Sequence, residues 1–330
     1  MRNLDIATTI PDNPRIRLIG KPIELETLVY KGPFNENINL IRNILRDYSE
    51  PLDIMPLGPN QLTDVFSVQK NLVAGAEADE RYLFYLYRWG RTDFSYAFGD
   101  VIRESIKMLA FHGRAWLEIR LGLDNEDKVV QVAFLPIYAE VEEEGEKETK
   151  FNSITWDRKT ISFSIDSNFL VPLSLAEVGF ADDLFLSVFK KIQKIPLITN
   201  QVEHVLHHEP WYNFNKKVHN RDMAILKATK TIYYAGAMGT NSNLMSDFHL
   251  IYRICHFKMI KRKIIDYIVN RVNQTLVTLE KDYGFPGQIE INAVAIDYMK
   301  YYDELTAGKI TIKEIFDIFE YGETKRNVNK

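Results

Sequence analysis

One segment, Ser246 to about Lys281, restricts the fold of this chain more than any other part of its sequence. Apolar residues recur in it every three or four positions, at Leu250, Ile251, Ile254, Phe257, Ile260, Ile264, Ile265, Ile268, Val272 and Leu276. This spacing predicts a single amphipathic helix of some ten turns, roughly 50 Å long at about 1.5 Å per residue. Ser246 is a suitable N-cap. We expect the face that carries Ile254, Ile265 and Ile268 to lie buried in a core.

The segments on either side of this helix are also mainly helical. Leu173 to Leu206 is predicted to be helical with a break at Pro196, because proline interrupts helical hydrogen bonding. Tyr212 to Thr231 is a second helical stretch, and residues 235–243 form a loop of mostly small residues. A short strand, Ile289 to Ala293, and two terminal helices are expected after the long helix.

The first half of the chain has signals for both helix and strand. Phe98 to Phe111 has the apolar spacing of an amphipathic helix, and Gly113 ends it because glycine tolerates the left-handed conformation that often follows a helix. Two strand pairs are expected next: Ala115 to Leu121 with Val129 to Leu135, and Ser153 to Trp156 with Thr160 to Ile165. The run from Glu140 to Lys150 holds six glutamates and is interpreted as a solvated loop.

The first 60 residues are rich in proline, asparagine and glycine, which predicts an extended arm with one short helix near Ile38 to Tyr48. An arm of this kind packs on a neighbour or stays mobile. A helix is possible from Gln61 to Ala74. The aromatic run from Tyr82 to Trp89 lacks regular alternation and fits either a helix or a buried strand.

Together these elements predict an α+β protein in which β-hairpins are followed by long helices. We expect four consecutive regions. These are an extended arm at 1–60, a mixed α/β domain at 61–172, a helical region ending in the small-residue loop at 173–245, and the long helix with C-terminal helices at 246–330. A length of 330 residues suits two or three sub-domains.

Composition excludes several classes of protein. The hydrophobic fraction of 46% and the charged fraction of 26% are those of a globular protein with a core. The residues from Met1 onward show no basic segment followed by an apolar run, so no secretory signal is expected. No stretch approaches the roughly 18 uninterrupted apolar residues of a membrane span. The single cysteine, Cys255, excludes an internal disulfide and a CxxC site. We therefore expect a soluble intracellular protein without a membrane partner.

Charge is distributed unevenly along the chain, whose net charge is -4. Between Leu186 and Arg271 there are 14 Lys and Arg against 5 Asp and Glu, whereas the rest of the chain is acidic. A basic block inside an acidic chain predicts one surface that faces a polyanion. The same lysines also fit the solvated faces of helices, and the sequence leaves both interpretations open.

A histidine-rich segment is the main candidate for metal chemistry. It contains His204, His207 and His208, with Glu209 beside them and His219 further along. His204 and His208 have the i, i+4 spacing of a zinc-hydrolase helix, but Val205 stands where the catalytic glutamate is required. We therefore interpret the cluster as a polar helix end and expect no metal site.

Other catalytic motifs are incomplete. Gly308-Lys309 lacks the earlier glycine and the following Ser or Thr of a phosphate-binding loop. Gly236 to Gly239 does not stand between a strand and a helix, as a dinucleotide site requires, and no GxSxG motif is present. Cys255 and His256 are neighbours that face different sides of the long helix, so a core cysteine is expected. We expect no catalytic residue, no cofactor and no enzymatic activity.

A helix followed by a hairpin carries the first of two family-like patterns. Residues 109–119 read Leu-Ala-Phe-His-Gly-Arg-Ala-Trp-Leu-Glu-Ile, and Val-Ala-Phe-Leu-Pro follows at 132–136. This resembles the portal proteins of tailed bacteriophages, which show a helix, a Gly-Asn-Ala-Tyr-like turn into a strand, and a return strand that ends in Leu-Pro. Arg114 stands in place of the usual Asn, and Trp116 in place of Tyr.

The second pattern lies at residues 301–314. Gly308 ends one helix, and Thr311 with Glu314 forms a capping box that starts the next. This is similar to the portal pattern of a helix, a glycine, an aliphatic-Thr step and a new helix that bears Glu. Lys313 stands in place of the usual Asn, and the following Arg is absent. The long helix from Ser246 takes the place of the portal spine helix, and the loop before it that of the tunnel loop.

The resemblance extends over roughly residues 95–318 and implies a portal-like fold, with a wing-like domain at 61–172 and a stem- and clip-like region at 173–245. It implies a structural, non-enzymatic subunit of a ring of about twelve copies at the capsid vertex. Double-stranded DNA would be packaged and ejected through this ring. The implied partners are further copies of the chain, double-stranded DNA bound without sequence preference, and capsid, terminase and neck or adaptor proteins. Assembly would take place in the host cytoplasm, and the protein would remain in the virion.

The resemblance also indicates which residues would line a DNA channel. They surround the small-residue loop: Lys227, Lys230, Gly236, Gly239, Asn241, Asn243, Arg253 and Lys258. The flanking cations would attract phosphate mildly. An ordinary surface loop between two helices explains the same sequence. Two further functions remain as alternatives: another phage connector protein, or a metal-dependent nuclease or hydrolase of a phage or host-defence system.

Overall fold

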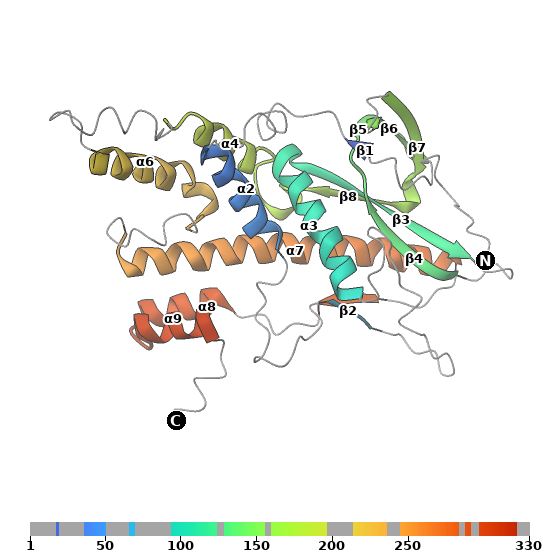
Figure 1. Ribbon diagram of the computed structural model, residues 1–330. Coiled ribbons are helices and arrows are strands. Elements are labelled where there is room, and N and C mark those ends of the chain that lie inside the picture. The colour runs from blue at the N-terminus through green and yellow to red at the C-terminus, as the bar shows by residue number, and fades with distance from the viewer. Residues whose placement is uncertain are drawn as a thin grey trace. The chain divides into compact units, whose positions relative to one another are not determined.

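The computed structural model describes residues 18–19, 36–50, 66–69, 94–123, 129–155, 160–196, 214–235, 245–283, 288–291 and 297–321. It contains helices and antiparallel sheets in one chain, which confirms the predicted α+β class (Figure 1). Contacts divide the chain into two units. Unit 1 comprises Met1–Leu25, Ser49–Asp182 and Lys263–Val294, and unit 2 comprises Glu26–Tyr48, Asp183–Arg262 and Ala295–Lys330.

The long predicted helix is confirmed as α7, Asp247–Tyr283, which has 37 residues and contributes its first part to unit 2 and the remainder to unit 1. Ser246 acts as its N-cap, because its Oγ accepts a hydrogen bond from the His249 amide at 3.3 Å. Ile265 and Ile268 are buried as predicted. Ile254 is only partly buried, so the predicted buried face is wrong at that position.

The centre of unit 1 is a three-stranded antiparallel sheet. Its middle strand β3, Arg114–Leu123, pairs with β4, Val129–Pro136, on one side and with β8, Leu170–Ser174, on the other. Helix α3, Phe94–His112, packs against β3 and β4 (Figure 1). Alternate β3 residues, Ala115, Leu117 and Ile119, are buried, as expected of a strand with one face toward a helix.

The turn from α3 into β3 depends on Gly113. Its φ is +73°, and its amide donates a 2.8 Å hydrogen bond to the Leu109 carbonyl. A Cβ on this residue would lie 2.3 Å from the carbonyl oxygen of Asp182 and 2.7 Å from the Asp182 Cβ. Both the left-handed backbone and the close approach of a second segment therefore require glycine here.

A second sheet in unit 1 is built around β6, Glu148–Thr155. It pairs with β7, Thr160–Asp166, and also with β5, Glu140–Glu144, and β1, Leu18–Ile19. The solvated loop predicted for Glu140 to Lys150 is therefore wrong, since both ends of that run are strands. The β5 glutamates point to solvent, while Val141 pairs with the fully buried Phe151 and fixes the register.

Two helix predictions in unit 1 are also wrong. Phe66–Gln69, within the helix considered possible at Gln61 to Ala74, is strand β2, and it pairs antiparallel with β9, Gln288–Ile291. The predicted helix from Leu173 begins later. Leu170–Ser174 is strand β8, a 3₁₀ turn follows at Ala176–Val178, and helix α4 spans Leu184–Gln193 in unit 2.

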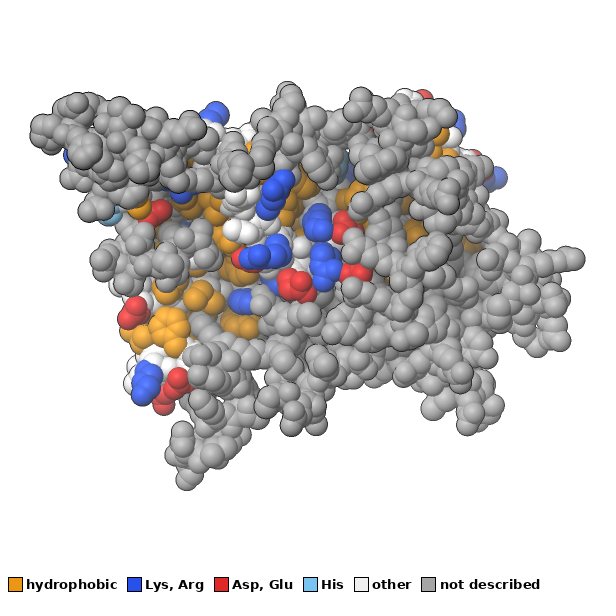
Figure 2. Space-filling view, viewed as in Figure 1, with side chains coloured by type: hydrophobic (Ala, Val, Ile, Leu, Met, Phe, Trp, Pro, Cys, Tyr) orange, Lys and Arg blue, Asp and Glu red, His pale blue; other side chains and the backbone are white. Residues whose placement is uncertain are grey.

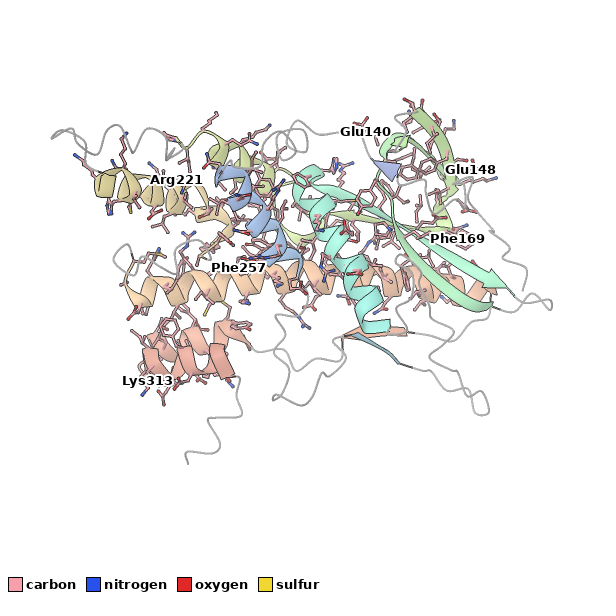
Figure 3. The ribbon with its side chains drawn as sticks, viewed as in Figure 1. Glu140, Glu148, Phe169, Arg221, Phe257 and Lys313 are labelled. Atoms are coloured by element: carbon pink, nitrogen blue, oxygen red, sulfur yellow. The ribbon has the colours of Figure 1, made fainter. Side chains whose placement is uncertain are left out.

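Unit 2 is helical in its described part. Helix α2, Glu36–Ser49, α4, α6, Phe214–Ala228, and the 3₁₀ turn η5, Lys230–Ile232, accompany the first part of α7. The predicted short helix near Ile38 to Tyr48 is confirmed as α2. The Tyr48 ring lies with its centroid 4.8 Å from Phe185 and 4.3 Å from Phe257, which Figure 3 labels on α7. These aromatic contacts hold α2, α4 and α7 together.

The two C-terminal helices, α8, Tyr298–Thr306, and α9, Ile312–Tyr321, form a hairpin on α7. One hydrophobic core is shared by the three helices and contains Ile251, Cys255, Tyr301, Ile310, Ile315 and Ile318. Gly308, with φ +68°, separates α8 from α9. Thr311 Oγ1 accepts from the Glu314 amide at 3.2 Å, and Glu314 Oε2 accepts from the Thr311 amide at 2.7 Å, which confirms the capping box.

Candidate functional site

The residues proposed for a DNA channel have different environments. Lys227, in the last turn of α6, and Lys230, in η5, are exposed, and Lys258 on α7 is partly buried. Gly236, Gly239, Asn241 and Asn243 lie outside the described residues. Arg253 is only 2% exposed. It therefore differs from the surface cation that its place in the basic block suggested.

The Arg253 side chain is bonded to the turn that follows α6. Its Nη2 donates to the Tyr234 carbonyl at 2.7 Å, the Thr229 carbonyl at 3.1 Å and the Thr229 Oγ1 at 2.9 Å. Its Nη1 lies 3.4 Å from the Leu226 carbonyl. The last carbonyls of a helix have no partner within the helix, and a cation satisfies them well. Arg253, a residue of α7, thus supplies hydrogen-bond donors to carbonyls at the C-terminal end of α6 and in the turn that follows it.

Burial of this guanidinium has an electrostatic consequence. It lowers the pKa of Arg253, although the nearby tyrosines Tyr48, Tyr233 and Tyr252 act in the opposite direction. Arginine still remains protonated at physiological pH because its ordinary pKa is above about 12. The site is therefore a permanently charged group surrounded by carbonyl oxygens, which is suited to fixing a backbone and has no acid–base function.

Two further hydrogen bonds join this turn to α2. The Tyr234 hydroxyl donates to Asp47 Oδ2 at 2.9 Å, and the Tyr48 hydroxyl donates to the Ile232 carbonyl. Burial raises the pKa of both hydroxyls, so they stay protonated and act as donors. Tyr233 adopts the left-handed conformation, with φ 53° and ψ 24°, and its side chain joins a different group of residues.

That group is an aromatic cluster on the first part of α7, comprising Tyr233, Phe248, His249, Tyr252, His256 and Tyr302. The Tyr252 and His256 centroids are 4.0 Å apart, and Tyr233 lies 4.7 Å from His256. The His256 Nδ1 lies 2.8 Å from the Tyr252 carbonyl. Phe248 remains 42% exposed, and Figure 2 shows hydrophobic side chains open to solvent where α8, α9 and the start of α7 lie. The cluster holds one ring from the turn after α6, Tyr233, against rings of α7, which also contact Tyr302 of α8.

A second buried cation of α7 satisfies another helix end. Lys261 is 3% exposed, and its Nζ donates to the Asp47 carbonyl, in the last turn of α2, at 2.9 Å. Arg253 and Lys261 are eight residues apart, which places them roughly 80° apart around the axis of α7. In unit 2, α7 thus holds the C-terminal ends of both α2 and α6.

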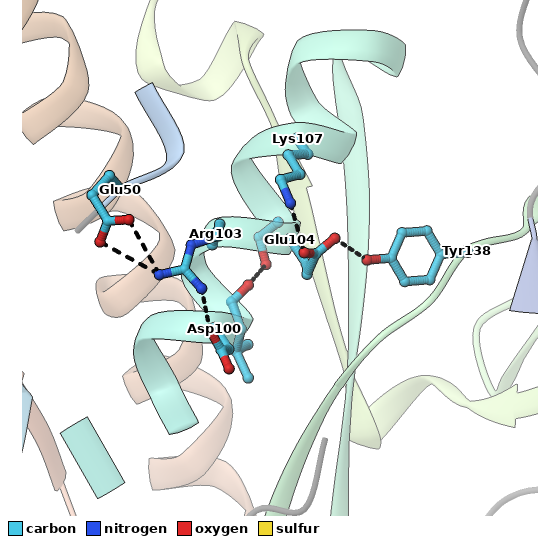
Figure 4. A network of polar contacts seen from close by, with 8 residues as sticks. Glu50, Asp100, Arg103, Glu104, Lys107 and Tyr138 are labelled. Atoms are coloured by element: carbon cyan, nitrogen blue, oxygen red, sulfur yellow. Dashed lines mark hydrogen bonds and ion pairs between the residues drawn. The ribbon is translucent and has the colours of Figure 1, made fainter. Parts of the chain in front are cut away.

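A polar network in unit 1 involves Glu50, Asp100, Arg103, Glu104, Lys107 and Tyr138 (Figure 4). Arg103 Nη2 lies 3.4 Å from both oxygens of Glu50, and Glu104 accepts from Lys107 at 2.8 Å and from Tyr138. The charges of this network are satisfied by one another. It attaches α3 to the segments before and after it in sequence, and we assign it no chemical role.

The described residues contain no group of three or more His, Cys, Asp or Glu arranged to hold a metal ion. His204, His207, His208 and Glu209 lie outside them, and His219 is exposed on α6. Burial raises the pKa of the Cys255 thiol to about 12, which makes it an unreactive core residue, as the sequence predicted. Within the same part of the chain, we find no helix with the length and apolar character of a membrane span.

Comparison with known proteins finds no protein-family model that matches this chain and no significant match among curated proteins. The site is therefore defined by its own geometry. Arg253 is recognisable in the sequence as one cation of the basic block, but its role is not, because the carbonyls that it bonds come from a turn outside its own helix. The signal that could have indicated it is a charged residue at the helical spacing of the apolar positions Phe257 and Ile260.

Proposed function

We propose that this chain is a structural, portal-like subunit that forms a ring through which double-stranded DNA passes. The observation that carries the proposal is the order of local structures along the chain. Helix α3, the Gly113 turn and the β3–β4 hairpin come first, then basic α6 and the long α7, then the Gly308 stop with the Thr311 cap. This order resembles that of the portal pattern.

The charge distribution of unit 2 supports this function. Helix α6 and η5 carry exposed lysines, Lys216, Lys217, Lys227 and Lys230, directly before the segment proposed to face DNA. A conduit should attract phosphate without holding one sequence, so scattered lysines suit it better than arginines in base-reading geometry. The buried Arg253 supports the proposal in another way, because it fixes the backbone at Thr229 and Tyr234, shortly before that segment in sequence.

Deletion of Gly239 to Ser242 tests the DNA-conduit function. We expect the shortened subunit to assemble as the complete chain does, while packaging or retention of DNA falls, because the deletion leaves the Arg253 and Ser246 attachments in place. A matched control deletes Gly145 and Glu146 at the exposed end of the β5–β6 hairpin, and should leave packaging unchanged. Normal DNA-filled heads with the first deletion would contradict the channel role.

The principal alternative is a metal-dependent nuclease or hydrolase that uses the histidine-rich segment. Elemental analysis separates the two. About one zinc per chain, lost together with activity in a His204→Ala, His208→Ala variant, would favour the hydrolase. We expect no stoichiometric zinc and no effect of this double substitution on assembly.

A further inference from the structure

The turn from Thr229 to Ala235 contains a residue, Tyr233, whose backbone conformation is unfavourable for its side chain. Tyr233 is the only non-glycine residue with a positive φ among the described residues. In this region the Cβ of an L-residue crowds the following carbonyl, so glycine or asparagine is the usual choice. A tyrosine here must be held by contacts from outside the turn.

Two sets of contacts hold it. On the backbone, Arg253 Nη2 bonds the carbonyls of Thr229 and Tyr234, on both sides of Tyr233, and Tyr48 bonds the Ile232 carbonyl. On the side chain, the Tyr233 ring lies 4.7 Å from His256 and 5.6 Å from Tyr252 between centroids. A hydrogen bond between the side chains of Tyr233 and Tyr252 is the main cause of the raised pKa of Tyr252.

Apart from the Tyr48 bond, which comes from α2, these contacts converge on one stretch of α7. Tyr252, Arg253 and His256 lie within five consecutive residues of α7. This short stretch of helix therefore contacts both the backbone of Thr229–Ala235 and the ring of Tyr233. The next described residues, Met245 and Ser246, lead directly into the same helix.

We propose that Thr229–Ala235 is a two-state clasp, closed by Arg253 on its carbonyls and by the Tyr233 ring on the aromatic cluster. Loss of either contact opens this turn while the rest of unit 2 stays folded. The unfavourable left-handed conformation of Tyr233 favours opening of the turn, because opening relieves it. Its consequence for DNA rests on the proposed function: in a portal-like subunit, the closed clasp fixes the exposed Lys230 relative to α7.

A set of four variants separates the two contacts. Tyr233→Ala removes the ring but keeps the energetic penalty of the left-handed backbone. Tyr233→Gly removes the ring and also that penalty. Arg253→Lys keeps the charge but replaces the planar guanidinium, which bonds oxygens through both Nη1 and Nη2, with a single ammonium group on a differently shaped side chain. Thr231→Ala alters an exposed residue of the same turn as a control. The lysine variant keeps the test informative where complete loss of the buried arginine would unfold the unit.

Amide hydrogen exchange followed by mass spectrometry measures opening in the 330-residue chain. We expect exchange in peptides covering 229–235 to rise at least tenfold for Tyr233→Ala and for Arg253→Lys. We expect it to rise about tenfold less for Tyr233→Gly than for Tyr233→Ala, because glycine has no left-handed penalty. Exchange in α2, α8 and α9 should stay within about twofold of the unmodified protein, as it should everywhere in Thr231→Ala.

Three results would overturn the clasp: equal exchange for Tyr233→Ala and Tyr233→Gly, no change for Arg253→Lys, or an equal rise in α8 and α9. The last result would make these residues ordinary determinants of global stability. The test is independent of ring formation. If the chain forms no ring but shows the expected exchange, the clasp is supported and the proposed function is contradicted. If it forms a ring but does not show the expected exchange, only the clasp is contradicted.

Discussion

Lys261 of α7 donates a 2.9 Å hydrogen bond to the main-chain oxygen of Asp47 in the last turn of α2, although this lysine is only 3% exposed. A buried lysine is costly unless it is well bonded. Its position beside the end of a helix offsets that cost, because the helix dipole and the unsatisfied carbonyls favour a cation there. The bond shows how α7 organises unit 2 by its charged residues as well as by its apolar face.

Replacement of Lys261 tests this role. Lys261→Met fills similar space but leaves the Asp47 carbonyl without its donor, and we expect a loss of about 1–3 kcal/mol in the free energy of unfolding. Lys263→Met, which replaces an exposed lysine on the same helix, should stay within about 0.5 kcal/mol of the unmodified protein. Urea denaturation followed by circular dichroism measures both. Equal effects of the two substitutions would show that Lys261 has no capping role.

Gly113 should tolerate no side chain. Gly113→Ala combines the left-handed penalty of about 1–2 kcal/mol with a clash against the Asp182 backbone. Gly179→Ala is the matched control. Gly179 has φ +88°, but among the described residues, its chain neighbours apart, no atom lies within 4 Å of the place that a Cβ would take, so this variant should show the backbone penalty alone. We expect the melting temperature to fall clearly further for Gly113→Ala. Equal melting temperatures would exclude the close approach of Asp182.

The apolar face of α7 gives a third prediction. Ile265 is 2% exposed, so Ile265→Asp places an unpaired charge in a core and should abolish soluble expression. Val277, on the same helix and 42% exposed, should accept Val277→Asp with little effect. The yield of soluble protein and its melting temperature compare the two. Normal yield and melting temperature for Ile265→Asp would contradict the helix face that we describe.

Alkaline pH should destabilise unit 2. Burial raises the pKa of Tyr48 and Tyr234 above the ordinary value of 10.0, so the folded state binds these protons more tightly than the unfolded chain. Their contribution to stability is complete below pH 10 and is lost as pH rises beyond it toward the raised pKa values. Stability measured against pH should therefore decline above about 10.

A phenylalanine variant isolates the tyrosine contribution. Tyr48→Phe lacks the titrating hydroxyl, so it should be less stable at neutral pH, where the Ile232 carbonyl loses its donor, but should show a shallower alkaline decline. Chemical denaturation at several pH values gives both quantities. An identical alkaline decline in the two proteins would exclude Tyr48 as a cause.

The features that sequence predicted correctly are those set by neighbouring residues. Helix α7 follows from a repeated apolar spacing, and its N-cap Ser246, the Gly113 turn and the Thr311–Glu314 cap each depend on residues a few positions apart. The α+β class follows from the same local patterns. Such features need no knowledge of the remote chain.

The features that sequence missed depend on partners outside the local segment, from the next strand of a hairpin to a strand near the other end of the chain. Strand β2 forms because Phe66–Gln69 pairs with Gln288–Ile291, and strand β5 because Val141 meets Phe151, although its exposed glutamates resemble a loop. Arg253 is buried because carbonyls from the α6 turn surround it. Each outcome is decided by tertiary contacts that override local preference.

Assembly into a ring is tested by the particle that the purified 330-residue chain forms. A negative-stain micrograph, with native mass measured on the same sample, gives both shape and size. The proposed function predicts closed rings of about twelve 38.4 kDa subunits, with a mass above roughly 400 kDa and a central channel. Particles no larger than a tetramer, or large particles without a channel, would contradict it.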